Sequence, residues 1–232
     1  MGEKKIGLVV FDMAGTTIED RGEVLRAFAG AMQKNQIPID EDFIQERRGA
    51  SKREVFRQCI EAQFGKADPE NPPRVEKAYD DFRSILEGLF ATEGIRPIEG
   101  AEDTFRWLRK EGIKIALTTG FYRKVTDVIL RTVGWNAGTI DASLCSDDVA
   151  MGRPAPYMIF RAMEATGIMS VRRVVNVGDT TLDLISAANA GVRGNVGVLS
   201  GSQKVDLLGR VQHTHIISSV AELPALLERA FL

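Results

Sequence analysis

Short, continuously apolar segments recur along this chain and constrain its fold more than any other feature. They are IGLVVF (6–11), IKIALTT (113–119), RVVNVGD (173–179) and GNVGVLS (194–200), with THIISS (214–219) as a weaker fifth. A segment that is apolar at successive rather than alternate positions is typical of a parallel strand buried on both faces. We therefore predict that these segments form one parallel sheet.

Helical patterns separate the strand segments. Apolar residues recur at helical spacing over 100–112, 122–135, 156–167 and 181–191, and most of these stretches close on a glycine. Strand followed by helix, repeated along the chain, predicts a Rossmann-like, doubly wound α/β fold. In such sheets ligands bind at the carboxyl ends of the strands.

The region between the first two strands differs from the rest. It reads as helical throughout, over 22–35, 40–49, 51–65 and 73–94, and the polar, proline-rich segment KADPENPP (66–73) interrupts it. We expect residues 21–97 to form an inserted all-helical cap domain. Residues 1–20 and 98–232 would then form the α/β core.

Composition excludes several classes of protein. The net charge is −2 with 27% charged residues, so no basic footprint for nucleic acid stands out. Cys59 and Cys145 match neither a metal-binding spacing nor a disulfide framework, which favours reduced thiols in a cytoplasmic protein. The apolar stretch at the N-terminus is too short for a signal peptide or a membrane span. We expect no nucleic-acid partner and no membrane partner.

Acidic and hydroxyl residues follow three of the predicted strands. Asp12 ends the first strand, Thr118 and Thr119 end the second, and GDTTLD brings Asp179 and Asp183 after a later one. Carboxyl ends of parallel strands meet at one edge, where three carboxylates would repel one another unless a cation lay among them. Oxygen ligands without histidine or cysteine suit Mg²⁺.

Each of these residues has a plainer interpretation when taken alone. An aspartate after a strand is commonly a helix cap or a turn former, Thr119 is an ordinary loop residue, and Arg153 in GRPAP is an ordinary surface charge. The order of the motifs and their common position at strand ends favour a shared site instead.

The motifs DMAGTT, TTG, GRPAP and GDTTLD together resemble the four motifs of the haloacid dehalogenase superfamily of phosphotransferases. Within it the chain most resembles phosphonatase (phosphonoacetaldehyde hydrolase) and phosphonatase-like hydrolases, through DMAGTT, TTGFYRKV and DDVAMGRPAPYM. The resemblance implies a Rossmann-like core with a helical cap. It also implies an enzyme that forms an aspartyl-phosphate.

The resemblance implies a role for each matching residue. Asp12 would be the nucleophile, while Thr119, Gly120 and Arg153 would hold the phosphoryl oxygens. The implied Mg²⁺ ligands are Asp12, the Ala14 carbonyl and Asp179, with Asp183 supporting the site. A carboxylate can attack phosphorus, a metal offsets the repulsion between the two anions, and arginine spreads the charge of the transferring group.

In the ordinary phosphatases that this superfamily resemblance brings in, the motif is Asp-x-Asp, and Ala14 stands at the position of the second aspartate. The second aspartate of such enzymes protonates the leaving oxygen, and acid catalysis of this kind is typically worth ~10²–10⁴-fold. Cleavage of a C–P bond needs an electron sink instead, and a lysine provides one by condensing with a neighbouring aldehyde. Phosphonatase carries such a lysine in its cap, and the corresponding residue here is Lys52 in RGASKREVF.

Two other interpretations of Lys52 stay open at this stage. A lysine in the first turn of a helix is usually a solvated surface charge, and the same pattern in relatives such as β-phosphoglucomutase carries a basic residue that helps to gate substrate. The chain also departs from phosphonatase, because Val55 stands where that family has a cap histidine.

The first function hypothesis is therefore Mg²⁺-dependent cleavage of the C–P bond of a small phosphonate such as phosphonoacetaldehyde. The alternative is a phosphatase for a small, phosphoglycolate-like phosphomonoester, with its acid supplied from elsewhere. The two aspartates of GDTTLD, which suit a metal site, argue against a metal-independent dehalogenase. The complete set of motifs argues against a non-enzymatic protein. A homodimer formed through the cap is a further expectation from the resemblance.

Overall fold

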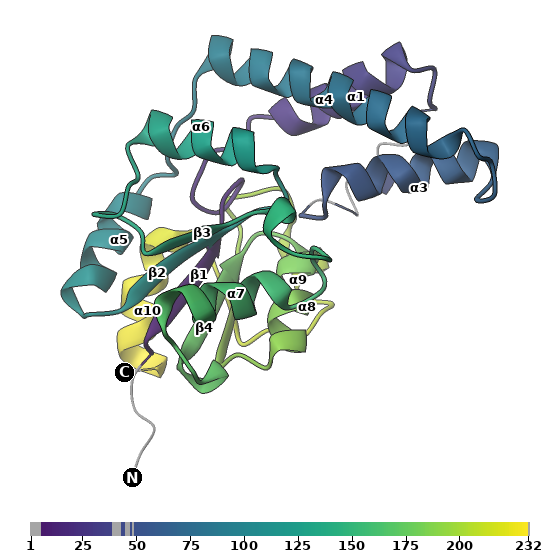
Figure 1. Ribbon diagram of the computed structural model, residues 1–232. Helices are drawn as coiled ribbons and strands as arrows, with labels where there is room; N and C mark the ends of the chain where they lie inside the picture. The colour runs from purple at the N-terminus through teal and green to yellow at the C-terminus, as the bar shows by residue number, and fades with distance from the viewer. Residues whose placement is uncertain (1–5, 39–42, 45–46, 48, 232) are drawn as a thin grey trace. The chain divides into compact units, whose positions relative to one another are not determined.

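The computed structural model describes residues 6–38, 43, 44, 47 and 49–231 (Figure 1). Its contacts divide the chain into two compact units. One unit contains Met1–Glu19 and Arg96–Leu232, and the other contains Asp20–Ile95.

The first unit is built on a parallel sheet, which confirms the predicted α/β class. Its strand order is β3-β2-β1-β4-β5-β6. The strands are β1 (Leu8–Asp12), β2 (Lys114–Thr118), β3 (Ala142–Leu144), β4 (Val174–Gly178), β5 (Gly194–Val198) and β6 (His215–Ile217). Strand β3 was not predicted, because it has only three half-buried residues and therefore no apolar run.

Helices connect the strands, as the alternating pattern predicts. They are α5 (Ala101–Lys110), α6 (Arg123–Val133), α7 (Tyr157–Thr166), α8 (Thr181–Ala190), α9 (Val205–Leu208) and α10 (Leu223–Ala230). Helices α6, α7 and α8 each end at a glycine in the left-handed conformation, which is the usual way to close a helix.

The two faces of β1 bury different layers. Leu8 and Val10 pack with residues of α7 and α8, including Ile159 and Ala187. The alternate residue Phe11 points to the opposite face and meets Phe105 of α5 edge-on, with ring centroids 5.4 Å apart. Successive side chains of a strand point to opposite faces, so a strand covered by helices on both sides must be apolar at every position. This requirement explains the unbroken apolar run at the start of the chain.

The chain leaves the first unit after Glu19 and returns to it at Arg96, and the two segments are paired there. The Glu19 N–H donates to the carbonyl of Arg96 at 2.9 Å, and the Ile98 N–H donates to the carbonyl of Thr17 at 2.9 Å. Ile18 forms an antiparallel bridge with Pro97. The chain therefore leaves the first unit and re-enters it through paired backbone.

The second unit is helical in its described part. It contains α1 (Glu23–Lys34), α3 (Lys52–Phe64) and α4 (Asn71–Glu93). Phe28, Phe56 and Phe82, one from each helix, form its aromatic centre, with ring centroids 4.7 to 5.8 Å apart.

Two details of this unit bear on the sequence predictions. The helix expected over 40–49 lies largely outside the described residues. The break expected over 66–73 is shorter than predicted, because α4 already begins at Asn71 and takes Pro72 and Pro73 into its first turn. Proline is tolerated there because the first N–H groups of a helix have no intrahelical partner.

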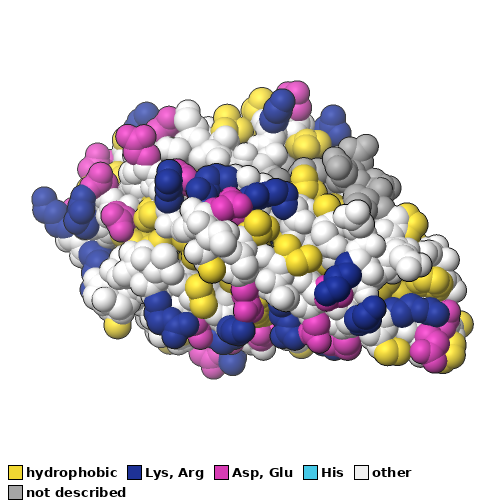
Figure 2. All heavy atoms as spheres, turned by 90° about the horizontal axis from the view of Figure 1, so that it is seen from above, with side chains coloured by type: hydrophobic (Ala, Val, Ile, Leu, Met, Phe, Trp, Pro, Cys, Tyr) yellow, Lys and Arg dark blue, Asp and Glu magenta, His cyan; other side chains and the backbone are white. Residues whose placement is uncertain are grey.

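The surface carries charges of both signs. On the face in Figure 2, Lys and Arg side chains are interspersed with Asp and Glu side chains, in keeping with the net charge of −2. No helix in the described part of the chain combines the length and the apolar character that crossing a bilayer requires.

Candidate active site

Asp12 is the last residue of β1, and a tight turn follows it. The N–H groups of Thr16, Thr17 and Ile18 all converge on the carbonyl of Met13, at 2.8 to 3.2 Å. The Thr17 hydroxyl donates to the carbonyl of Asp12 at 3.0 Å. The turn over Met13–Ile18, called the nucleophile loop below, thereby satisfies its own backbone and fixes the main chain that carries Asp12.

The same loop sets the direction of the Ala14 carbonyl. The Gly15 N–H donates to the carbonyl of Ile18 at 2.7 Å. The peptide bond is planar and trans, so the Ala14 carbonyl of that peptide unit points the opposite way. Gly15 has φ of 88°, a conformation that residues with a side chain rarely adopt. The DMAGTT sequence therefore needs its glycine to present this carbonyl.

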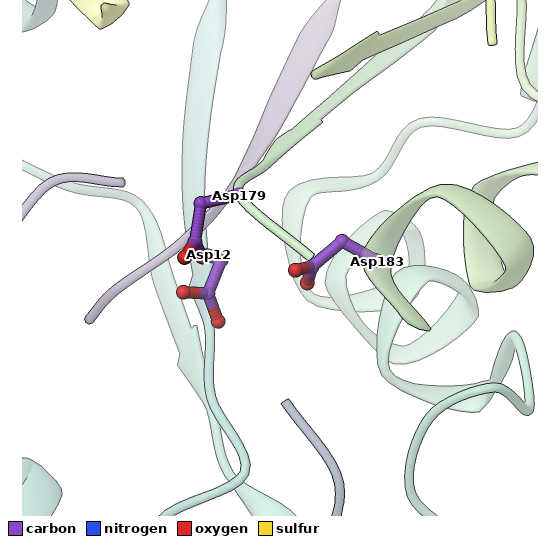
Figure 3. Close-up of side chains that lie close together, drawn as sticks. All are labelled: Asp12, Asp179 and Asp183. Atoms are coloured by element: carbon purple, nitrogen blue, oxygen red, sulfur yellow. The ribbon is translucent and has the colours of Figure 1, made fainter. Parts of the chain in front are cut away.

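Three carboxylates meet at the carboxyl end of the sheet (Figure 3). Asp12 comes from β1, Asp179 directly follows the adjacent strand β4, and Asp183 lies in the first turn of α8. Each offers one oxygen, and these oxygens lie within 4.8 Å of one another. All three residues are buried. The structure thus brings together the three acids that the sequence placed at strand ends.

Arg153 joins two of these acids. Its Nη1 donates to Asp12 Oδ1 at 2.7 Å, its Nε pairs with Asp183 Oδ1 at 2.9 Å, and its Nη2 donates to the hydroxyl of Thr118 at 2.6 Å. Only 6% of the residue is exposed. The alternative of an ordinary surface charge is therefore wrong for Arg153. The guanidinium instead compensates part of the negative charge of the cluster.

Asp183 has a second function as a helix cap. Thr180 is the N-cap of α8, and its hydroxyl donates to Asp183 Oδ2 at 2.5 Å while its N–H donates to the same oxygen at 3.1 Å. The Asp183 N–H returns a bond to the Thr180 hydroxyl at 3.3 Å. This reciprocal arrangement is a capping box. It holds Asp183 at the edge of the cluster, where its Oδ1 meets Arg153.

Burial and the neighbouring charges both act on the pKa of Asp12. Burial raises the pKa of its carboxyl well above the ordinary value. The positive charge of Arg153 lowers that pKa, and the neighbouring Asp183 and Asp179 raise it again. A cation held among these oxygens would lower the pKa of Asp12 and favour the carboxylate form.

The donor set fits Mg²⁺. The described residues of the cluster offer carboxylate oxygens from Asp12, Asp179 and Asp183, and the cluster contains neither histidine nor cysteine. Hard oxygen ligands of this kind suit Mg²⁺ rather than zinc or copper. One arginine cannot balance three carboxylates, so the site retains the negative charge that attracts a divalent ion.

Thr119 and Gly120 follow β2 at the same edge of the sheet. The Thr119 N–H donates to the carbonyl of Leu144, and its hydroxyl accepts a hydrogen bond from the Phe121 N–H at 3.1 Å. Its neighbour Thr118, which sequence reasoning left without a role, is the threonine that contacts Arg153. In a short TT pair, the sequence does not indicate which hydroxyl turns toward the arginine.

A further set of contacts was missed entirely by sequence reasoning. Ser202, after β5, donates to Asp179 Oδ2 through both its N–H, at 2.8 Å, and its hydroxyl, at 2.9 Å. Thr16 of the nucleophile loop donates to Asp179 Oδ1 at 3.4 Å. The strand-end rule that located the acids also applies to β5, and it was the available signal for Ser202.

Lys52 belongs to the other unit, where it is the first residue of α3. Only 7% of it is exposed, and its Nζ donates to the carbonyl of Ala50 at 3.2 Å. The interpretation of Lys52 as a solvated surface charge is therefore wrong. Val55, at the position where phosphonatase has a histidine, is 2% exposed.

Comparison with known proteins agrees with this geometry. A model of the haloacid dehalogenase-like hydrolase family matches residues 9–196. The chain is 30% identical over 214 residues to a phosphonoacetaldehyde hydrolase of Bacillus cereus, covering 88% of this chain and 79% of that protein.

Solved structures show the same fold. A hydrolase from Pseudomonas syringae superposes with a TM-score of 0.85 at 20% identity, covering 97% of this chain and 100% of the other. A phosphonoacetaldehyde hydrolase-like protein from Oleispira antarctica gives 0.84 at 22% identity, covering 97% and 92%. The family model spans most of the chain and includes Asp12, Asp179 and Asp183. The chain is a hydrolase of the haloacid dehalogenase-like family.

Proposed function

We propose that this hydrolase cleaves the C–P bond of a small phosphonate such as phosphonoacetaldehyde, in a Mg²⁺-dependent reaction through an aspartyl-phosphate on Asp12. The observation that carries the proposal is Ala14. Its peptide unit directs a carbonyl toward the side opposite the Gly15 N–H, and its methyl side chain supplies no proton. The curated relatives named phosphonoacetaldehyde hydrolase support the same substrate class.

A missing proton donor matters less for a C–P bond than for a C–O bond. A departing alkoxide is a strong base and gains much from protonation, which is where a general acid contributes its ~10²–10⁴-fold. A departing carbon instead needs its electron pair delocalised. An iminium ion next to that carbon provides this delocalisation.

The first half of the reaction uses Lys52 and Asp12. The amine of Lys52 adds to the aldehyde carbon, and loss of water leaves an iminium ion. One carboxylate oxygen of Asp12 then forms a bond to phosphorus as the C–P bond breaks. The electron pair of that bond moves onto the carbon and toward the iminium nitrogen, which gives an enamine on Lys52 and a phosphoryl group on Asp12.

The second half restores both residues. Water attacks the phosphorus of the aspartyl-phosphate, which releases inorganic phosphate and returns the Asp12 carboxylate. The enamine takes a proton on carbon, and a second water hydrolyses the resulting iminium to acetaldehyde and free Lys52. The water lost in iminium formation balances one of the two waters used. The net reaction therefore consumes one water.

The remaining residues of the first unit bind and orient the substrate. Arg153 spreads the negative charge of the transferring phosphoryl group, and Thr119 and Gly120 hold its oxygens. Asp12, Asp179 and the Ala14 carbonyl hold the metal, with Asp183 in support. When bound, Mg²⁺ offsets the repulsion between the Asp12 carboxylate and an anionic phosphorus compound.

A second candidate function follows from Val55. A valine offers no titratable group at the position where phosphonatase has a histidine, three residues after Lys52. A phosphatase for a small, phosphoglycolate-like phosphomonoester needs neither that histidine nor an iminium. Its leaving-group proton would come from water, from the substrate or from another residue of the second unit.

Borohydride trapping tests the first proposal. Borohydride reduces an iminium to a stable amine, so the protein treated with phosphonoacetaldehyde and borohydride should gain the mass of a reduced adduct on Lys52. The Lys52→Arg variant should gain no adduct and should lose turnover. Lys66, an exposed lysine of the same unit, provides the matched control variant Lys66→Arg. Full activity of Lys52→Arg would contradict the Schiff-base role.

A substrate panel separates the two functions. Release of phosphate from phosphonoacetaldehyde, but not from phosphoglycolate and similar esters, supports the phosphonatase. Release from the esters alone supports the phosphatase. In either case we propose a cytoplasmic enzyme, in keeping with two cysteines, Cys59 and Cys145, that form no disulfide. A homodimer through the expected cap, residues 21–97, is a further proposal, which light scattering of the purified protein would check.

A further inference from the structure

A segment outside the four family motifs lies against the acidic cluster. It is the turn Ser200–Gln203, which follows β5 and is called the clasp loop below. Ser200 Oγ donates to the carbonyl of Gly15 at 2.8 Å. Gln203 Oε1 accepts from the N–H of Thr181, the first residue of α8, at 2.7 Å. The clasp loop therefore connects the nucleophile loop to the helix that carries Asp183.

Between these two connections, Ser202 holds the carboxylate of Asp179. Both its N–H and its hydroxyl donate to Oδ2, at 2.8 and 2.9 Å. We infer that Ser202 is a positioning residue of the Mg²⁺ site: it fixes the rotation of the Asp179 carboxylate and thereby the place of the other oxygen. The inference rests on the metal site of the proposed function, and it assigns no catalytic role to Ser202 itself.

The backbone at Gly15 and at Gly201 approaches the Asp179 carboxylate closely, which leaves room for the contact between Ser202 and Asp179. A Cβ added to Gly201 would overlap Asp179 Oδ2, and one added to Gly15 would lie 2.6 Å from the same oxygen. The Asp179 carboxylate therefore lies between two glycines, one in the nucleophile loop and one in the clasp loop. The two serine donors reach Oδ2 because neither loop has a side chain in the way.

The rest of the clasp loop keeps Ser202 in place. Gln203 is 5% exposed, and its contact satisfies one of the N–H groups at the start of α8 that have no intrahelical partner. The Ser200 contact holds the loop from the other side. Both ends of the segment are thus tied to elements that carry predicted metal ligands or their support. A displacement of the clasp loop would therefore break the contact with the Gly15 carbonyl or the contact with the Thr181 N–H.

Partners of metal-binding carboxylates set the affinity for the metal. Replacing such a partner typically lowers metal affinity or activity by ~10–100-fold. Ser202→Ala removes the hydroxyl donor and keeps the N–H donor. We therefore expect metal affinity to fall about tenfold, at the lower end of that range. Ser202→Thr keeps a hydroxyl at the same place and should restore most of the affinity. Gly201→Ala should weaken binding more than Ser202→Ala, because it displaces the carboxylate or the loop.

Binding of Mn²⁺, measured by electron paramagnetic resonance of the free ion, tests this inference without substrate or turnover. Mg²⁺ then competes for the same site and gives its own dissociation constant. The series comprises the wild-type protein, Ser202→Ala, Ser202→Thr and Gly201→Ala. Ser219→Ala is the matched control, since its hydroxyl accepts a hydrogen bond from the Ala221 N–H at 3.2 Å in a turn after β6. That variant should lose some stability and no metal affinity.

The outcomes separate the positioning role from the proposed function. If the wild-type protein binds no Mn²⁺, the metal site fails, and with it the inference. If the wild type binds Mn²⁺ and Ser202→Ala binds it equally well, the positioning role alone is overturned. A tenfold loss in Ser202→Ala that Ser202→Thr does not rescue also contradicts a role for the hydroxyl. Should Ser202→Ala not fold, Ser202→Cys, which replaces the hydroxyl by a weak donor, is titrated instead.

Discussion

Arg153 Nη1 donates to Asp12 Oδ1 at 2.7 Å, and both side chains are almost completely buried. A buried carboxylate is costly unless it is paired and hydrogen-bonded. The guanidinium also pairs with Asp183 Oδ1 at 2.9 Å. One arginine therefore stabilises two of the three carboxylates, and the free energy of folding depends on it whenever no metal is bound.

Removing this arginine should destabilise the metal-free protein and increase its response to metal. Breaking a buried ion pair by removing one partner costs about 3–5 kcal/mol, because the other charge is left uncompensated. We expect Arg153→Ala to unfold at a clearly lower temperature in EDTA, and Mg²⁺ to raise that temperature more than in the wild type. Differential scanning calorimetry with and without Mg²⁺ measures both effects.

The control for this prediction is a surface ion pair. Arg106 pairs with Asp103 on α5, and both side chains are largely exposed. Surface pairs contribute about 0–1 kcal/mol, so Arg106→Ala should change the unfolding temperature little. An Arg153→Ala protein as stable in EDTA as Arg106→Ala would contradict the importance of the buried pair.

Placing an acid at position 14 should shift the enzyme toward phosphate esters. Ala14→Asp supplies the carboxyl that can protonate a leaving oxygen, and it retains the backbone carbonyl. General acid catalysis supports an increase of ~10²–10⁴-fold in turnover of an alkyl phosphomonoester. The gain should be smaller for nitrophenyl phosphate, whose leaving group is a weak base. Phosphate release from the two esters, compared between wild type and variant, measures the effect.

Ala14→Asn is the matched control, because it has the shape of aspartate and lacks the titratable carboxyl. It should leave ester hydrolysis near the wild-type level. If Ala14→Asn gained as much as Ala14→Asp, proton donation would not be the cause. If neither variant gained, the leaving-group proton in this enzyme would already come from another residue.

The two cysteines should differ in reactivity. Burial raises the pKa of the Cys145 thiol to about 11, while Cys59 is partly exposed. The thiolate is the reactive form, so we expect iodoacetamide at pH 8 to modify Cys59 far faster than Cys145 in the folded protein. Mass spectrometry of the native protein follows both sites. Equal labelling in urea provides the control for intrinsic reactivity.

The raised pKa of Cys145 also predicts a pH effect on stability. Between the ordinary value of 9.0 and about 11, the thiol ionises in the unfolded chain and stays protonated in the folded one. The folded state then binds more protons, so its stability falls as pH rises through this window. The wild type should lose stability relative to Cys145→Ala between pH 9 and pH 11, as urea denaturation would measure. A constant difference would contradict the shift.

Beryllofluoride tests the nucleophile without substrate. This phosphoryl analogue bonds to an aspartate carboxylate with Mg²⁺ present, so we expect the pair to raise the unfolding temperature of the wild type. Stabilisation by a ligand at 100 times its dissociation constant is about 2.7 kcal/mol. Asp12→Asn should lose this stabilisation, because the amide cannot replace the carboxylate. Stabilisation that persists in Asp12→Asn would assign the binding to another group.

Much of the fold was predictable because a strand buried on both faces requires a run of apolar residues, which is easy to recognise in the sequence. Strands such as β1 and β4 are covered on both faces, so nearly every residue is apolar and the run stands out. Strand β3 has only three half-buried residues and leaves no such run. The short helix α9, with Leu208 as its buried residue, likewise has too little periodicity to be recognised.

The acidic cluster was predictable for a different reason. Asp12 ends β1 and Asp179 follows β4, and these two strands pair directly in the sheet, so the rule that ligands bind at strand ends brings the two acids together. The same rule points to the loop after β5 and to the threonine pair at the end of β2, but it does not predict the contacts that Ser202 and Thr118 make there. They depend on which way a loop turns and on which of two adjacent hydroxyls meets Arg153, and hydroxyl residues are common in every loop.

The paired backbone at Glu19 and Arg96 has a consequence for engineering of this protein. The segments that leave and re-enter the first unit are joined by a hydrogen bond. Residues 20–95 are therefore an insertion whose two ends lie next to each other in the first unit. A short turn joining Glu19 to Arg96 would close the backbone without moving Asp12 or Asp179. The junction is thus a point at which one helical module could be exchanged for another, Lys52 included, while the acidic cluster keeps its own scaffold.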